Sequence, residues 1–591
     1  MNKHIIKGAV AAMMVCGLAS CDLEEYNPAG STADNIFTSQ DGFNALVNSA
    51  YAYWGGQLYG REDPVLLWNG GGDEWINIAN GGYGRQLSKY QECLSTQGQF
   101  SNTWVRLYEI VNDCNAGIER HGNVVWTDSH MARVRMGELS FMRALAYWHI
   151  VENFGNVVLR TNETKVMEPK AYRSTYEDLY KLMFDDLQTA CENLDPDPYP
   201  ANEVGRATLK AAYGLMARVA LTYVQYCNSQ AEKDKFYEKA EAAARYVIDN
   251  QASLKVSLYD TPAEVYAKEN NKTNHEAMFV VTHSTVSSQN MKSGNPYRLH
   301  SYFHAKYSGW CGMTQNYTDG NDKNGKAGGM CMMPTRHLLN LFDEEKDSRY
   351  NAWFKEDYYL NIDDYVWKDV DIEHFEMNPS MVGQTVSKGD LVMRFTKKAV
   401  DDKRNKPYAV VDINDIYDPA TGAVSTKANF NIHFPTLIKF DDGSIEARSL
   451  PTNSELGSND VFLMRLPEMY FIVAECQVMK SGGSTAEAAK YINVIRKRAA
   501  VPGHETEMEA KASEMTLDYI LEERSRELCG EHLRWFDLKR TGKIVEYIKT
   551  RNYNPDIAPY VNENCGLRPI PQNFLNSITN PEEFGQNPGW S

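Results

Sequence analysis

The sequence has 591 residues and a formal net charge of −17, from 61 basic and 78 acidic side chains. A chain with this acidic balance and no basic stripe is a poor partner for nucleic acid. After the first 20 residues, no segment approaches the roughly 20 consecutive apolar residues of a membrane-spanning helix. The sequence therefore predicts that any attachment to a membrane is made through the N-terminus.

The first 20 residues have the order of a secretory signal peptide. Lys3 and Lys7 form a short positive segment, residues 9–19 are small and apolar, and Leu18-Ala19-Ser20 precedes Cys21. This order is a targeting signal and not part of the fold. The ending resembles the lipobox of bacterial lipoproteins, which implies cleavage before Cys21 and diacylation of its thiol. A plain signal peptide followed by a coincidental cysteine is the alternative.

Diacylation would make Cys21 a membrane anchor, because two acyl chains give the stable attachment that one chain does not. The residues that follow it, Asp22, Glu24 and Glu25, are acidic. They resemble the surface-export signal of lipoproteins of the Bacteroidetes type. The resemblance implies an outer-membrane protein that is lipid-anchored and exposed on the cell surface.

Residues 21–255 are dominated by helical patterns. Apolar residues recur at spacings of three and four, which predicts amphipathic helices. The predicted helices are 41–53, 101–120, 127–154, 176–194, 207–226 and 236–250. Residues 208–218 and 236–248 alternate large and small side chains in the way that lets paired helices interlock, as in tetratricopeptide (TPR) repeats. We therefore expect an N-terminal TPR-like part.

Residues 256–460 differ in character, because Gly, Asn, Asp and aromatic residues are frequent and the regular patterns are short. Residues 278–282 and 407–411 are strand-like runs. Loops of this length are uncommon unless they are functional. Cys311 and Cys331 flank a glycine-rich stretch here and are the candidates for a disulfide. We expect a loop-rich, partly β insertion.

Helical patterns return in residues 461–591. Pro467 lies where a first-turn proline is tolerated and opens a helix over 467–480. Ser484 and Glu487 have the spacing of a capping box at the start of a helix over 484–500, and a further helix is expected over 516–530. The tail after Asn552 is rich in Pro and Asn. The predicted fold is mostly α, a TPR-like α-α superhelix that carries the insertion.

Several segments together resemble the SusD/RagB family of outer-membrane nutrient-binding lipoproteins, in the order expected for that family. They are Arg135-Met-Gly-Glu138 through Phe154-Gly155; Pro334-Thr335 through Arg349; Leu463-Met-Arg465-Leu-Pro-Glu468; Asn493-Val-Ile-Arg496-Lys-Arg498; Glu523-Arg524-Ser-Arg526-Glu527 through Arg540; Leu567 to Pro571; and Gln586-Asn587-Pro588-Gly589. His532 and Pro467 depart from the usual pattern. The resemblance implies one SusD-like domain over residues 21–591.

The family resemblance also implies a function. It implies capture of an oligosaccharide at the cell surface and its delivery to a SusC-like TonB-dependent transporter, over which the lipoprotein closes. The RagB branch of the family implies peptides as the alternative cargo. Neither function needs a cofactor, and none is expected.

Catalytic and metal-binding motifs are not found in the sequence. It contains no HExxH, GxSxG or Walker-type motif. His300 and His304 have no obvious third metal ligand. A surface glycosidase that uses Asp73 or Glu523 is the enzyme alternative. However, Glu522 and Glu523 lie four and three residues before Arg526, which favours ion pairs along one helix face. We therefore expect no enzyme and no metal site.

The candidate ligand site rests on aromatic residues in turn-prone segments, because glycans present flat C–H faces ringed by hydroxyl groups. The first segment contains Trp68, Asp73, Trp75, Asn77, Tyr83 and Arg85, the second contains Tyr307 and Trp310, and a third covers residues 353–359. Aromatic residues are more often core than ligand platforms. Nearby glycine makes Trp68, Trp75 and Trp310 the strongest candidates for exposed platforms.

Overall fold

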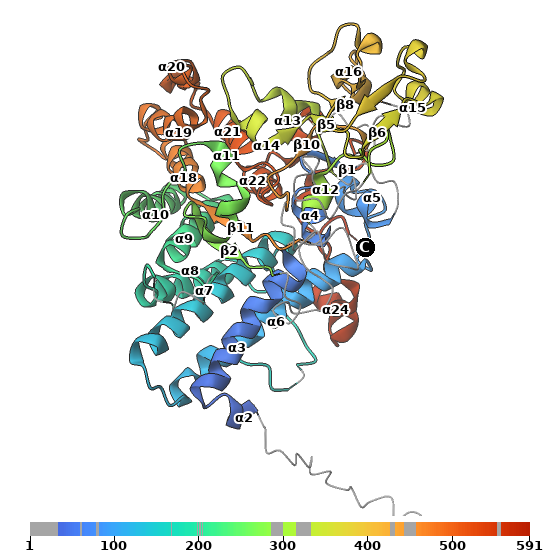
Figure 1. Ribbon diagram of the computed structural model, residues 1–591. Coiled ribbons are helices and arrows are strands. Elements are labelled where there is room, and N and C mark those ends of the chain that lie inside the picture. The colour runs from blue at the N-terminus through green and yellow to red at the C-terminus, as the bar shows by residue number, and fades with distance from the viewer. Residues whose placement is uncertain are drawn as a thin grey trace, which may run out of the picture.

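Helices packed side by side form the larger part of the molecule, as the computed structural model shows (Figure 1). The structure describes residues 33–59, 62–77, 82–166, 168–197, 199, 203, 205–284, 299–314, 332–425, 432–442, 457–551 and 557–590. Cys21 and Cys331 lie outside these residues. The anchor and the disulfide therefore stay predictions.

The predicted helices are present, with ends that differ by up to three residues, except that the helix predicted over 236–250 starts at Gln230. The principal helices are α3 (Gln40–Tyr53), α6 (Gly98–Arg120), α7 (Ser129–Phe154), α8 (Tyr176–Asn193), α9 (Leu209–Tyr223), α10 (Gln230–Asp249), α18 (Leu466–Met479), α19 (Thr485–Ala499) and α21 (Leu517–Leu528). Helix α7 packs against α6 and α8, α10 against α9 and α18, and α18 against α19. The mostly helical, TPR-like fold class is confirmed.

Polar side chains at the helix starts explain several of these boundaries. Asp128 accepts hydrogen bonds from the backbone N–H groups of His130 and Met131 at the start of α7. Ser484 accepts from the backbone of Glu487 at the start of α19. Only this half of the predicted capping box forms, because the backbone N–H of Ser484 donates to Gln477 instead. Such caps satisfy amide groups that have no partner within the helix.

Helix α7 is buried on nearly all its faces because helices surround it. Its charged side chains are therefore paired. Arg143 donates to both oxygens of Asp186, at 2.8 and 2.7 Å, and Glu138 accepts from Arg135 at 2.6 Å. A buried charge without a partner would cost several kcal/mol. These pairs explain how a helix with so many charged residues can lie in the core.

Short strands and helices replace the long helices in the middle of the chain. The strands are β1 (Trp75–Asn77), β2 (Ala277–Val281), β3 (Met332–Pro334), β4 (Phe354–Lys355), β5 (Asp357–Tyr359), β6 (Asp364–Val366), β7 (Thr385–Ser387), β8 (Leu391–Phe395), β9 (Ala409–Val411), β10 (Thr436–Leu437) and β11 (Val461–Arg465). β2 pairs with β11, and β1 pairs with β3. Helix α15 (Asp369–His374) and the strands β5 to β9 form a lobe, which we call the insertion lobe, at the top of Figure 1.

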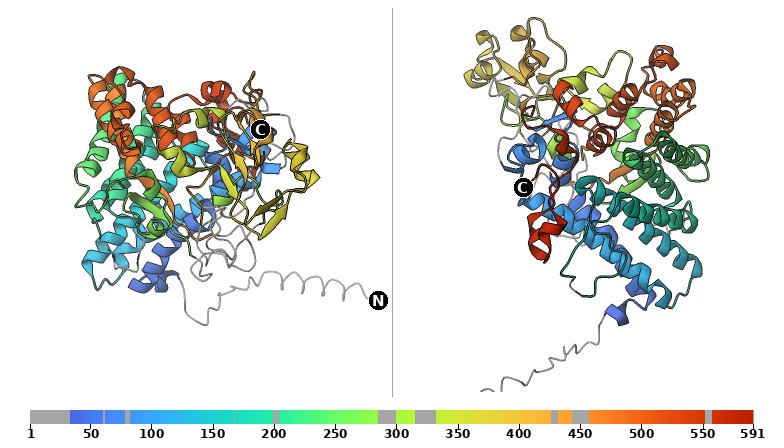
Figure 2. Two further views of the ribbon diagram at one scale, coloured as in Figure 1. Left: turned by 45° about the horizontal axis from the view of Figure 1, so that its top comes forward. Right: turned by 180° about the vertical axis from the view of Figure 1, so that it is seen from behind.

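The C-terminal tail returns to the helical part. Helix α24 (Gln572–Ser577) packs against α6, and the right view of Figure 2 shows it, in red, well below the insertion lobe. The Asn587 side chain donates to the backbone oxygens of Phe154 and Arg568, at 2.9 and 2.7 Å. The tail is thereby fastened to the end of α7. Domain boundaries at residues 255 and 460 stay a prediction.

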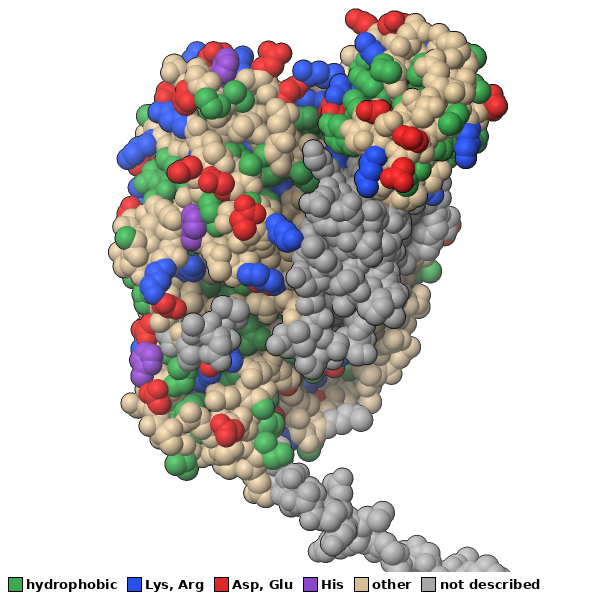
Figure 3. Space-filling model, in the orientation of Figure 1, with side chains coloured by type: hydrophobic (Ala, Val, Ile, Leu, Met, Phe, Trp, Pro, Cys, Tyr) green, Lys and Arg blue, Asp and Glu red, His purple; other side chains and the backbone are tan. Residues whose placement is uncertain are grey.

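The surface is mixed in charge. Lys, Arg, Asp and Glu side chains are interspersed over the helical face shown in Figure 3. Within the described part of the chain, no helix combines the length and the apolar character that crossing a membrane requires.

Candidate functional site

The first predicted ligand segment lies in the core. Trp68, at the end of α4 (Glu62–Trp68), and Trp75, in β1, are both 0% exposed. The indole N–H of Trp68 donates to Asn153 at 3.1 Å, and Trp75 meets Phe303 edge-to-face at 4.7 Å. The expectation of exposed platforms at these two residues is wrong. Trp75 is buried because β1 pairs with β3, a strand far away in the sequence.

The polar residues of the same segment are structural as well. Both carboxylate oxygens of Asp73 accept hydrogen bonds from Arg534, at 2.7 Å each, and Asp73 is buried. Burial alone would raise the pKa of Asp73, but the guanidinium group of Arg534 holds it below its usual value. Asn77 is buried and donates to Ser88 at 3.3 Å. Asp73 and Asn77 are therefore not available to a ligand at the surface.

Tyr83 and Arg85 belong to α5 (Gly82–Lys89). Their side chains lie outside the described part of the structure. Their role in binding stays a prediction.

The two aromatic residues of the second predicted segment differ in burial. Tyr307 is buried and stacks on Tyr358, with ring centroids 5.1 Å apart, so it cannot act as a surface platform. Trp353 in the third segment is also buried, and its indole N–H donates to the Pro262 carbonyl. Among the described side chains of the candidates in the first two segments, Trp310 alone is not buried, and in the third segment Tyr359 is half-buried as well.

Trp310 is held in a turn against the insertion lobe. Gly309, with φ +86°, starts the turn, and the backbone N–H of Met313 donates to the Trp310 carbonyl at 2.8 Å. The backbone N–H of Cys311 donates to Asp371 of α15 at 2.9 Å. These bonds place the indole of Trp310 flat on the ring of His374, with centroids 3.6 Å apart and planes 15° apart.

The two histidines beside Trp310 are uncharged at neutral pH. His374 and His433 approach through their Nε2 atoms at 3.0 Å. Burial lowers the pKa of both side chains, that of His433 to about 3. Trp310 is therefore backed by a neutral aromatic ring, and it is the feature of this structure that best matches a platform for an apolar sugar face.

The carboxylates of the enzyme alternative are neutralised by arginines. Glu523 lies 2.8 Å from Arg349 and 2.7 Å from both Arg496 and Arg526. Although burial opposes it, these charges hold the pKa of Glu523 far below its usual value. A general acid needs a raised pKa and a partner carboxyl across a cleft. The predicted pairing of Glu523 with Arg526 is confirmed, and the geometry of Glu523 is that of a structural group.

Metal-ligating side chains do not gather in the described part of the chain, where no group of three or more His, Cys, Asp or Glu is placed to hold an ion. His304 is buried, and the side chain of His300 is not described.

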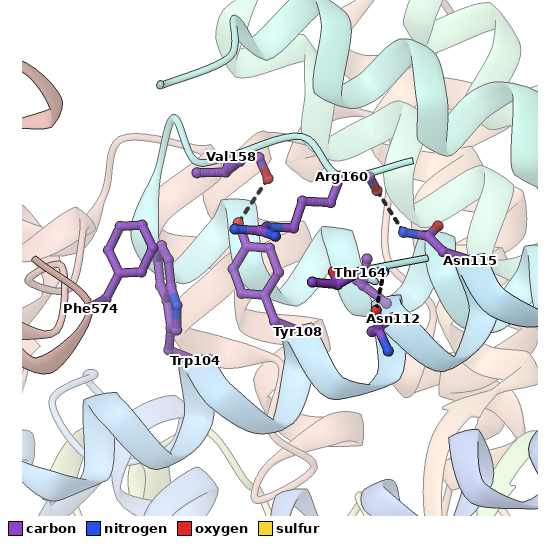
Figure 4. Close-up of a pocket in the computed structure, with 9 residues that line it drawn as sticks. Trp104, Tyr108, Asn112, Asn115, Val158, Arg160, Thr164 and Phe574 are labelled. Atoms are coloured by element: carbon purple, nitrogen blue, oxygen red, sulfur yellow. Dashed lines mark hydrogen bonds between the residues drawn. The ribbon is translucent and has the colours of Figure 1, made fainter. Parts of the chain in front are cut away.

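A pocket that the sequence analysis missed lies between α6, the segment 158–164 and α24 (Figure 4). Its cavity volume is about 160 Å³, and it is lined by Trp104, Tyr108, Val111, Asn112, Asn115, Val158, Arg160, Thr164 and Phe574. Trp104 and Tyr108 lie four residues apart on α6, which is also the spacing of core residues. Phe574 comes from the opposite end of the chain. No local pattern could therefore have revealed this pocket.

Comparison with known proteins places the whole chain in a family. A family model described as the SusD family matches residues 279–590, and a second, described as starch-binding and associating with the outer membrane, matches residues 74–221. The first match covers more than half of the chain. The chain belongs to the SusD family.

Individual relatives agree with this family and with the fold. A SusD-like protein, P25, from Formosa agariphila is 23% identical over 93% of both chains. A laminarin-binding SusD-like protein matches with a TM-score of 0.65 and 20% identity, over 94% of this chain and 100% of its own. Surface glycan-binding protein A from Bacteroides fluxus matches with a TM-score of 0.64 and 18% identity, over 93% and 99%.

In this SusD-family chain, the segments that carry the sequence resemblance hold the core together. Arg465 donates to both oxygens of Glu531 at 2.8 Å and lies 3.1 Å from Glu527. Glu468 accepts from Arg218 of α9 at 2.8 and 2.6 Å. These buried pairs join β11 to α21 and α9 to α18, which explains why the motif residues are polar although they lie in the interior.

Proposed function

We propose that this SusD-family protein is a lipid-anchored outer-membrane protein that binds oligosaccharides at the cell surface and passes them to a SusC-like TonB-dependent transporter. Support comes from the family, from the outer-membrane description of one matching model, and from neighbours whose names state binding of laminarin or surface glycan. The single observation in this chain that carries the binding proposal is Trp310, half-buried and stacked on His374.

Binding at one such platform is weak. A sugar face of roughly 80 Å² buried on Trp310 contributes about 2 kcal/mol at about 25 cal/mol per Å². The entropy lost on association consumes much of this contribution. A receptor that hands its ligand directly to a neighbouring transporter tolerates weak binding, because the local concentration of the ligand is high. The anchor at Cys21 is then part of the mechanism, since it keeps the receptor beside the transporter.

The first test removes the platform. Trp310→Ala should weaken binding to an immobilised polysaccharide, such as laminarin or starch, by roughly 30-fold, the equivalent of about 2 kcal/mol. Trp590→Ala is the matched control, because Trp590 is also a half-buried tryptophan but lies in the C-terminal tail. Affinity electrophoresis measures both variants. Equal effects of the two substitutions would refute binding at Trp310. Binding to a peptide library but to no glycan on an array would refute oligosaccharide as the cargo.

The second test separates binding from anchoring. The Cys21→Ala protein should bind the glycan normally after purification, whereas cells that carry it should lose growth on that glycan. Growth at the wild-type rate would contradict a mechanism in which the lipid anchor holds the receptor at its transporter.

A further inference from the structure

The pocket in Figure 4 is formed by chain segments that hydrogen bonds hold together. The hydroxyl group of Tyr108 donates to the Val158 carbonyl at 2.9 Å, and the side chain of Asn112 accepts from the backbone of Thr164 at 2.9 Å. Asn115 donates to the Arg160 carbonyl at 3.1 Å. The segment 158–164 is thus fastened over α6, so the pocket is preformed.

One wall of the pocket is aromatic. The ring of Trp104 lies 5.0 Å from that of Tyr108 and 4.8 Å from that of Phe574, each measured between centroids. Phe154 supports Trp104 edge-to-face at 5.1 Å from behind. Aromatic rings held in this way offer a rigid apolar surface to one face of a small ring-shaped ligand.

The other side of the pocket carries a guanidinium group. The backbone of Arg160 is fixed by Tyr147, whose hydroxyl group accepts from the Arg160 N–H at 2.7 Å and donates to the Arg160 carbonyl at 2.8 Å. The Arg160 side chain is 25% exposed and lies 3.4 Å from Glu168, whose side chain is 61% exposed. An ion pair this long, with so exposed a partner, contributes little to stability. A ligand carboxylate can therefore take the place of Glu168 at low cost.

We propose that this pocket binds one sugar ring that bears a carboxylate, a hexuronate residue, with its apolar face on the half-buried ring of Tyr108, which the buried Trp104 supports, and its carboxylate on Arg160. Its volume of about 160 Å³ is smaller than that of a site for a drug-sized ligand, which restricts the occupant to a single small ring. Charge-assisted bonds from arginine to a carboxylate are among the stronger hydrogen bonds in proteins. The pocket is a site separate from Trp310, which lies against the insertion lobe at the other end of the molecule (Figure 1), and the inference does not depend on the proposed platform.

The experiment titrates the protein without its leader with D-glucuronate and, separately, with D-glucose. Saturation-transfer NMR measures the binding of each sugar. Glucuronate should bind about tenfold more tightly than glucose, because only glucuronate gains the charged bond. Arg160→Gln should remove this preference and leave glucose binding unchanged. Phe574→Ala should weaken the binding of both sugars, because the Phe574 ring lines the pocket beside Trp104. A melting curve of each variant checks the fold.

Two control variants test whether glucuronate binds in this pocket or elsewhere on the protein. Arg404→Gln removes an exposed arginine that also pairs with a glutamate, Glu376 at 3.1 Å, and should change nothing. Trp310→Ala should leave the glucuronate preference as it is. Equal binding of the two sugars to the wild-type protein would overturn the proposal. So would a preference that survives Arg160→Gln, or one that disappears with Trp310→Ala.

Discussion

The sharpest test of the core concerns Asp73, a residue that the sequence suggests as a ligand contact and the structure buries. Asp73→Asn removes the negative charge that Arg534 meets with two hydrogen bonds of 2.7 Å, between side chains that are 0% and 3% exposed. Removing one partner of a buried ion pair costs about 3–5 kcal/mol. We expect a loss near 3 kcal/mol, since Arg534 keeps its bond to the Leu521 carbonyl and the nearby Glu74 at 3.7 Å.

Urea unfolding followed by tryptophan fluorescence measures this loss, and affinity electrophoresis on the same samples measures glycan binding. The double variant Asp73→Leu with Arg534→Met is the control. It should be more stable than Asp73→Asn, because both charges are then absent from the interior. A single variant with unchanged stability and lost glycan binding would refute our reasoning, since Asp73 would then be a ligand contact.

Three further predictions concern pH and backbone geometry. Arg465 and Lys439 overcome the effect of burial and hold the pKa of Glu531 at about 2. The Glu531 carboxylate therefore contributes its full stabilisation above about pH 4.5, and this stabilisation is lost as the pH falls toward 2. The urea midpoint of unfolding should fall over this pH range, and it should fall less steeply in Glu531→Gln. Burial raises the pKa of Glu74 to about 7. Glu74→Gln should therefore stabilise the protein by about 1–3 kcal/mol at pH 8, where the buried carboxylate is charged, and by much less at pH 5. If the variant were stabilised equally at both pH values, burial of the charge would not be the cause. Gly155 ends α7 with φ +75°, and a Cβ at this position would lie 3.1 Å from the Tyr176 hydroxyl oxygen. Gly155→Ala should therefore lower the free energy of unfolding by at least about 1 kcal/mol. Gly122→Ala is the control and should cost little, because the space around Gly122 is open.

The positions of the helices and the ion pairs within a helix could be predicted, because they depend on residues close together in the sequence. The spacing of apolar residues located α3 and α6 to α10 to within a few residues at most ends, with the start of α10 earlier than expected. The helical ion pair of Glu523 with Arg526 also followed from spacing alone. Both depend on the fixed geometry of a helix, in which residues three and four apart meet.

The ligand site depended on information that local patterns do not contain. Glycine is close in sequence to each of Trp68, Trp75 and Trp310. The residues around them therefore do not show which of the three side chains is exposed. β1 carries Trp75 into the core because its partner is β3, and Asp73 is neutralised by Arg534 from the far end of the chain. Trp310 stays at the surface because its own turn docks on α15.

By itself, the sequence determined the helices and the family, and it predicts an N-terminal leader that ends before Cys21. Only the tertiary structure decided which aromatic side chains reach the surface, and it alone brought Phe574 beside Trp104 to form a pocket. The physical reason is that helix formation is largely local, whereas burial is a property of contacts between segments that are distant in the chain.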